Sequence, residues 1–139
     1  MTREQEEVAE SNLAFYRAFE SLDIREMEKV WLREDYVRCI HPGWARISGW
    51  EDVLSSWRRI FENTQEMRFE LTEVTIHVQG VLAWLTLYEN ISTRVEGETS
   101  RGIILTTNIF EKWQGRWWII HHHGAPTVAP PSKPPSTLH

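Results

Sequence analysis

Histidine is the side chain in this sequence best suited to acid–base chemistry, because an imidazole loses its proton near neutrality, at about pH 6.5. His41 stands directly before Pro42-Gly43, a pair that ends a strand and begins a turn. A histidine at such a strand end could take a proton from a bound molecule. Cys39 shares its strand face and could act as a thiolate, although a lone strand cysteine is more often a small apolar core residue.

Three consecutive histidines, His121 to His123, raise the question of a metal site. Neighbouring strand residues point to opposite faces of a sheet, so only His121 and His123 could share an ion. A catalytic zinc site needs a third protein ligand, and no HExxH motif, cysteine pair or acidic cluster supplies one. We therefore expect no metal and no cofactor, and we interpret the pair as hydrogen-bonded side chains at a dimer interface.

These histidines belong to a strand predicted from Arg116 to His123, between a Gln114-Gly115 turn and the breakers Gly124 and Pro126. Alternation gives two sets of side chains: Trp117, Ile119, His121 and His123 on one face, and Trp118, Ile120 and His122 on the other. Both faces of the strand carry apolar side chains near its start, so other parts of the protein must pack against each face. N-terminal helices can cover one face, and we expect a second subunit to cover the other.

Three helices are predicted in the first half of the chain. The first, from about Arg3 to Ser21, opens with a Thr-x-x-Gln capping box, and the shorter second helix is capped by Asp23. Ser48 stands three residues before Glu51, which predicts a second capping box and a third helix with a continuous apolar stripe.

From Met67 the apolar pattern changes to period two, and glycine-containing turns separate the strands. The predicted strands cover residues 68–78, 81–94, 98–113 and 116–123, after a short strand at 36–41. Strands this long must twist and bend. The sequence thus predicts an α+β domain, with three helices of the N-terminal half packed on a strongly curved antiparallel sheet.

This order of elements resembles the nuclear transport factor two-like superfamily, also called SnoaL-like or ketosteroid-isomerase-like. The resemblance covers Val8 to Pro126, and its most specific segment, Gly115 to Pro126, is similar to the association domain of calcium/calmodulin-dependent kinase two. The resemblance implies a cone with an internal cavity and a homodimer through the outer sheet face. The fold hosts isomerases, dehydratases and noncatalytic assembly domains, so it does not by itself give the function.

The likeness to ketosteroid isomerases implies catalytic roles for Tyr16, His41 and Asn108. Tyr16 lies where an isomerase tyrosine donates to the developing oxyanion, and His41 stands in place of the general-base aspartate. Thr107, with Asn108 beside it, occupies the place of a second, acidic oxyanion donor. Neither residue is an acid, which argues against Δ5-steroid isomerisation. We expect Asn108 to donate a hydrogen bond to a carbonyl or hydroxyl group.

The same comparison implies which strand side chains face the cavity. It turns inward the residues Trp84, Thr86, Tyr88, Trp118, Ile120 and His122. Trp44 follows the His41 turn at the expected cavity mouth. We therefore predict a binding site for a small, largely apolar molecule, formed by Trp44, Trp84, Tyr88, Thr107, Trp118 and His122.

The length, charge and composition of the chain indicate its domain organisation, its partners and its location. The 139 residues predict a single domain, residues 1–126, followed by a proline-rich tail, residues 127–139. A net charge of −5 argues against nucleic acid and anionic membranes as partners, because these bind clustered Lys and Arg. One cysteine, no signal-peptide pattern and no apolar run of about 18 residues lead us to expect a cytoplasmic protein.

The sequence is compatible with two functions. The first is a dimeric protein whose cavity binds a small molecule and carries out isomerisation, dehydration or hydrolysis by acid–base chemistry. The second is a noncatalytic self-association module similar to the kinase association domain.

Overall fold

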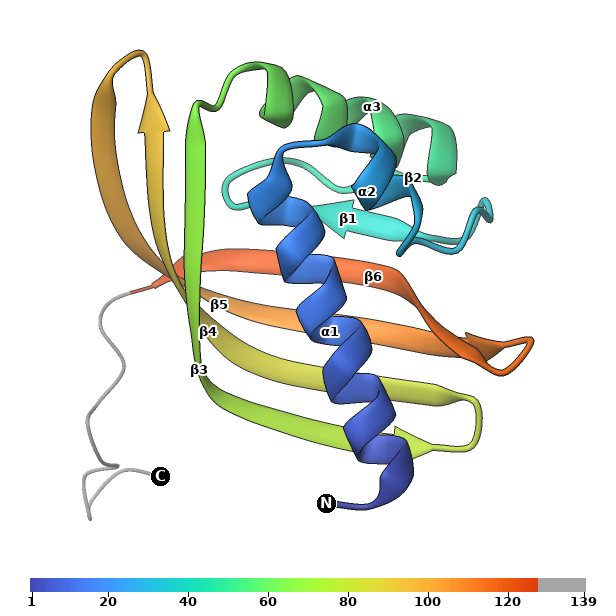
Figure 1. Ribbon diagram of the computed structural model, residues 1–139. Coiled ribbons are helices and arrows are strands. Elements are labelled where there is room, and N and C mark those ends of the chain that lie inside the picture. Colours follow the sequence, from blue (N-terminus) through green and yellow to red (C-terminus); the bar gives the residue numbers. More distant parts are fainter. Residues whose placement is uncertain (128–139) are drawn as a thin grey trace.

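The computed structural model describes residues 1–127, in which three helices pack against one face of a six-stranded sheet (Figure 1). The elements are α1 (Arg3–Ser21), α2 (Ile24–Glu28), β1 (Arg38–Ile40), β2 (Ile47–Ser48), α3 (Trp50–Glu62), β3 (Glu66–Gln79), β4 (Leu82–Val95), β5 (Glu98–Trp113) and β6 (Arg116–Thr127). None of these helices is long and apolar enough to cross a membrane.

The strand order is β2-β1-β6-β5-β4-β3, and the sheet curves without closing into a barrel (Figure 1). The predicted α+β class and the four long strands are confirmed. The prediction of a purely antiparallel sheet is wrong at one pair, because β1 runs parallel to β6. This pairing places Cys39 opposite His122 and brings the two histidine-bearing segments together.

Two of the three predicted helix starts are confirmed. Thr2 accepts from the Gln5 backbone N–H while the Gln5 side chain accepts from the Thr2 backbone N–H, and the Asp23 side chain accepts from Arg25. The capping box predicted at Ser48 is wrong, since Gly49 is the N-cap and makes no side-chain cap. Ser48 is instead part of β2, opposite Arg38.

A β-bulge in β6 changes which side chains face the helices. Phe110 pairs with Ile119 and Ile109 pairs with His121, so Ile120 is an extra residue without a partner on β5. Trp117, Ile119 and His122 are consequently all buried beneath the helices. The prediction that His122 faces inward is confirmed, and the prediction that Trp118 joins it on that face is wrong.

The predicted facing of β4 is also wrong. Ala83, Leu85, Leu87 and Glu89 are at most 2% exposed and face the helices, whereas Trp84 is 39% exposed on the outer face. Both alternating sets of this strand are largely apolar, so periodicity alone could not choose between them. The outer set also contains Thr86 and Tyr88.

The core between helices and sheet is dominated by aromatic rings from α1 and α3. Phe19 lies 4.7 Å from Trp57 and 4.6 Å from Phe69 between ring centroids, and Phe15 lies 5.8 Å from Trp57. Burial of each such ring contributes about 2 kcal/mol. These contacts fix α1 across the concave face of the sheet.

Strand β6 does not end at His123 as predicted. Gly124 to Thr127 continue the pairing with β5, opposite Thr106 to Ile103. Proline is tolerated there because β1 pairs with β6 only as far as His123, which leaves the other edge of β6 free. Thr127, predicted as the start of the tail, is therefore a strand residue, and the rest of that tail lies outside the described residues.

Gly124 allows a close approach of the chain that also positions His41. A Cβ on Gly124 would lie 2.8 Å from the Ile104 Cγ2 and 3.3 Å from the Pro42 Cγ. We expect Gly124→Ala to lower the free energy of unfolding by about 1–3 kcal/mol through this overpacking, measured by urea denaturation. Gly102→Ala is the matched control, since its Cβ would meet Ile91 at 3.8 Å. Equal stability of the two variants would contradict this packing.

Candidate functional site

The interior contains a set of polar side chains among the aromatic rings. They come from α1, β4, β5 and β6, and each is at most 3% exposed: Asn12, Tyr16, Glu89, Thr106, Asn108 and His122. Burying so many polar groups costs free energy unless they hydrogen-bond to one another. Their mutual contacts therefore define the candidate site.

Glu89 and Tyr16 form the centre of this set. The Tyr16 hydroxyl donates to a Glu89 carboxylate oxygen at 2.5 Å. Burial raises the pKa of the Glu89 carboxyl to about 7, although the hydrogen bond from Tyr16 opposes this rise. Burial and the neighbouring Glu89 charge raise the pKa of Tyr16 well above 10.0. Glu89 can therefore gain or lose a proton near neutral pH, while Tyr16 remains a donor.

Asn108 links this pair to the histidine on β6. Its side-chain N–H groups donate to Asn12 Oδ1 at 3.0 Å and to the Tyr16 hydroxyl oxygen at 3.2 Å. Its carbonyl oxygen lies 2.6 Å from His122 Nδ1, so that nitrogen must carry the proton. Burial lowers the pKa of His122 well below 6.5, and the ring is therefore neutral with its lone pair on Nε2.

His41 lies beside this network but is hydrogen-bonded elsewhere. Its Nε2 is 2.9 Å from the Ser56 hydroxyl, which itself donates to the Val53 carbonyl. Ser56 must therefore accept, and His41 Nε2 must donate. Burial lowers the pKa of His41 to about 4, which makes it a poor base at pH 7. Burial likewise raises the pKa of the Cys39 thiol, which excludes a reactive thiolate in this state.

The structure brings together some of the predicted site residues and separates others. Tyr16, Asn108 and His122 form one hydrogen-bonded chain, and the His41 ring lies 6.4 Å from the His122 ring. The predicted ligand walls Trp84, Tyr88, Thr107 and Trp118 belong to the outer sheet face and do not reach this interior set.

Asn12, Glu89 and Thr106 belong to this interior set but are not among the site residues predicted from the sequence. Asn12 occupies one step of the apolar stripe of α1, and Glu89 continues the buried set Ala83, Leu85 and Leu87. A polar residue at an apolar position was the available signal. It could not be used for Glu89 without knowing which face of β4 is buried.

A surface hollow lies between α3 and the segment that contains Trp44 and β2. It has a volume of about 710 Å³ and is lined by Trp44, Ser56, Arg59 and residues 45–48, among others. Trp44 is 38% exposed, and its ring lies 4.9 Å from the His41 ring. Ser56 lines this hollow and its hydroxyl oxygen accepts from His41 Nε2, so the hollow lies on the His41 side of the interior network.

The described part of the chain contains no group of three or more His, Cys, Asp or Glu side chains that could hold a metal ion.

Comparison with known proteins gives matches over most of the chain. A family model described as a SnoaL-like domain matches residues 8–129. The F-box protein SKIP8 of Arabidopsis thaliana is 32% identical over 114 residues, which are 82% of this chain and 47% of that protein. The chain thus spans about half the length of this curated relative.

Two solved structures share both fold and sequence with the chain. A putative dehydratase of the NTF2-like family from Streptomyces avermitilis is 33% identical, with a TM-score of 0.85 over 91% of this chain and 97% of that one. A putative calcium/calmodulin-dependent protein kinase type II association domain from Thiobacillus denitrificans is 30% identical, with a TM-score of 0.76 over 85% and 93%.

The raised pKa of Glu89 predicts a pH-dependent stability. Because the folded protein holds this proton up to about pH 7 and the unfolded chain only to about 4.5, wild-type stability should fall as pH rises through this window. Glu89→Gln lacks this loss. The free energy of unfolding of Glu89→Gln minus that of wild type should therefore be about 3 kcal/mol larger at pH 8 than at pH 4.5, measured by urea denaturation.

The control is Glu98→Gln, which makes the same substitution at an exposed position of β5. A constant difference between Glu89→Gln and wild type across this range would show that Glu89 is not a buried carboxyl of raised pKa.

Proposed function

Because the chain belongs to the SnoaL-like family of NTF2-like proteins, which includes enzymes and noncatalytic members, we propose that it binds a small neutral molecule in its interior and moves a proton on it. The observation that carries this proposal is the buried Glu89–Tyr16 pair. The substrate would be a largely apolar molecule bearing a carbonyl or hydroxyl group.

A carboxyl in this position is costly for a purely structural core. Removing an ionisable group from water costs several kcal/mol, and an apolar residue of similar volume would avoid that cost. A carboxyl with a pKa near 7 is instead well matched to proton transfer at neutral pH, because both of its forms are populated.

The hydrogen bonds around Glu89 suggest how a ligand would activate it. In the absence of a ligand, the single Tyr16 proton is donated to Glu89. A ligand carbonyl that accepts the Tyr16 proton instead frees the carboxylate to take a C–H proton next to that carbonyl. Tyr16 then stabilises the charge that develops on the ligand oxygen, and Asn108 supports it by donating to the Tyr16 oxygen. Return of the proton to another carbon completes an isomerisation, and its transfer to a departing hydroxyl group completes a dehydration.

The side chains around Glu89 and Tyr16 favour a neutral, flat ligand. None of the buried polar side chains in the described chain is Lys or Arg, so an anionic ligand would lack a counter-charge. The rings of Phe15, Phe19 and Phe69 surround Tyr16 at centroid distances of 4.9 to 6.4 Å. The buried Trp57 indole N–H has no acceptor among the described residues, which leaves a donor for a ligand oxygen.

This proposal changes the role first predicted for His41. Glu89 replaces it as the base, because His41 has a pKa of about 4 and donates to Ser56. His41 would instead form part of the wall between the Trp44 hollow and the interior. The dehydratase name given to the Streptomyces relative is consistent with proton chemistry in this fold, and it supports the proposal without fixing the substrate.

Deuterium exchange tests the proposed proton transfer directly. Incubation with 1-tetralone or 2-cyclohexenone in D₂O should give deuterium incorporation next to the carbonyl above the buffer rate, measured by mass spectrometry. Glu89→Gln should lower the protein-dependent rate by at least about 100-fold, because it removes the base. Glu98→Gln should retain the wild-type rate. The proposal fails if wild type does not exceed buffer, or if Glu89→Gln exchanges as fast as wild type.

A second candidate function is noncatalytic self-association through the outer sheet face. Trp84 and Leu105 are 39% and 43% exposed there, and the Thiobacillus relative is named as an association domain. The outer face would then form a homodimer, as the sequence predicts. Exposed apolar side chains on a sheet face favour such a partner.

Light scattering tests the outer face as an interface. The double variant Trp84→Glu/Leu105→Glu should halve the molar mass of a wild-type dimer, because it places charges in an apolar contact. Val81→Glu, at a 58% exposed turn position, should leave the mass unchanged. A monomeric wild-type protein, or an unchanged mass in the double variant, would exclude this interface.

A further inference from the structure

A second hollow, separate from the interior site, lies between the α2–β1 connection and the β5–β6 hairpin. Its volume is about 580 Å³. Trp31 and Leu32 are buried residues that contribute to its lining, and the more exposed aromatic side chains are Tyr36, Trp113 and Trp118. We refer to these five residues as the aromatic groove.

The aromatic groove presents partly exposed rings, of which Tyr36 and Trp118 are held by side-chain hydrogen bonds. Trp113 is 50% exposed and Tyr36 is 45% exposed. The Trp118 indole N–H donates to the Trp113 carbonyl at 3.3 Å, and the Tyr36 hydroxyl donates to Glu111 at 2.8 Å. Exposed aromatic rings held in this way form a preorganised apolar surface, which is typical of a binding site.

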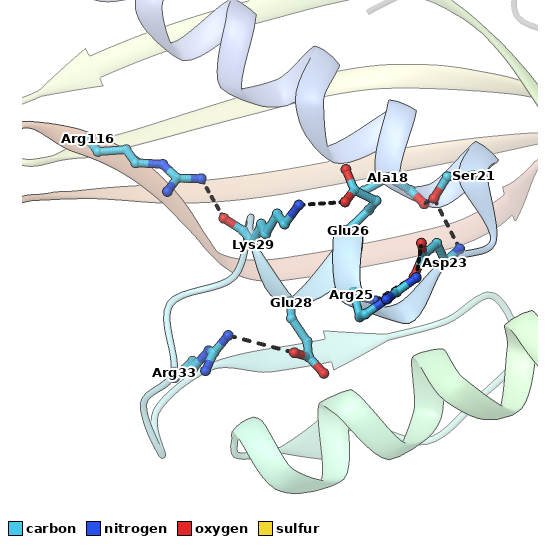
Figure 2. A network of polar contacts seen from close by, with 9 residues as sticks. All are labelled: Ala18, Ser21, Asp23, Arg25, Glu26, Glu28, Lys29, Arg33 and Arg116. Carbon is cyan, nitrogen blue, oxygen red and sulfur yellow. Dashed lines mark hydrogen bonds and ion pairs between the residues drawn. The ribbon is translucent and has the colours of Figure 1, made fainter.

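Basic side chains at the rim are already engaged. Arg116 lies 3.9 Å from the Trp118 ring centroid. Its guanidinium also donates to the Lys29 carbonyl, as Figure 2 shows. Arg33 pairs with Glu28 in the same view. Lys29 itself pairs with Glu26 at 2.7 Å (Figure 2).

Two acidic side chains at the rim remain available to a cation. Glu34 and Glu111 line the hollow, and among the described residues neither has an ion pair within 4.0 Å. An occupant that combines apolar rings with one positive charge would match this surface.

The chain itself contains such a sequence. Residues 128–139 hold four of its six prolines, as Pro130-Pro131 and Pro134-Pro135 on either side of Ser132-Lys133. Proline-rich sequences favour the extended polyproline conformation, and aromatic-lined grooves bind them because proline rings pack on aromatic faces at a small entropic cost.

We propose that the aromatic groove binds residues 129–135 of a second copy of this chain, with Lys133 near Glu34 and Glu111. The segment after Thr127 is too short to place both proline pairs in the groove of its own chain, which favours a second copy. Trp118 and Thr127 pair with Glu111 and Ile103, which lie eight positions apart on β5, a distance of about 26 Å along the strand. Pro131 follows Thr127 by four residues and can extend at most about 14 Å from it. The first proline pair therefore cannot enter the groove of its own chain.

Calorimetric titration of a synthetic peptide tests this proposal. The peptide has the sequence of residues 127–139, and the receiving protein is the full chain with Pro130, Pro131, Pro134 and Pro135 replaced by Ala, so that its own segment does not compete. We expect a dissociation constant on the order of 100 µM or tighter. A peptide with the same four Pro→Ala replacements should bind at least tenfold more weakly.

Variants of the receiving protein locate the site. Trp113→Ala should weaken peptide binding at least tenfold, whereas Leu13→Ala, 44% exposed on α1, should change it less than twofold. Circular dichroism verifies that both variants are folded. No binding at about 1 mM peptide, or equal binding to Trp113→Ala, overturns the proposal. Binding of a decaproline peptide without binding of the chain's own sequence also overturns it, and would indicate a foreign proline-rich partner.

Discussion

A carboxyl group buried in an aromatic core determines how the helices lie on the sheet. Glu89 is 2% exposed, and the Tyr16 hydroxyl is its direct side-chain partner on α1. Leaving such a group unpaired would cost several kcal/mol. Helix α1 must therefore cross the concave face where Tyr16 meets both β4 and β5, and the contacts of Asn108 with Asn12 and Tyr16 hold it in that position.

The β-bulge at Ile120 completes this interior arrangement. Without the extra residue, His122 would face outward with Trp118, and the Asn108 carbonyl would lose its donor. The same shift places His121 and His123 on the opposite face of β6. Parallel pairing with β1 then brings His41 and Pro42 next to this row, where Gly124 leaves the space that Pro42 occupies. Local backbone irregularities thus determine which polar groups meet.

The sequence predicts those parts of the fold that depend on neighbouring residues. The Thr2–Gln5 capping box and the glycine turns act over a few positions, so α1 and the long strands are predicted closely. The start of α3 is missed because a tertiary pairing takes Ser48 into β2. The facing of β4 could not be predicted, since Trp84 and Leu85 are equally suited to burial. Tyr16, Asn108 and His122 are predicted as site residues, whereas Glu89 depends on that unresolved facing.

The central claim is that Glu89 is a buried carboxyl that titrates near neutrality. Difference infrared spectroscopy against Glu89→Gln isolates its carbonyl stretch, and a pH titration then gives its pKa directly. We expect a protonated carboxyl band that is present at pH 5 and disappears with a midpoint near pH 7. Disappearance of the band with a midpoint near 4.5, as for a carboxyl in water, would contradict both the buried pair and the proton chemistry proposed for it.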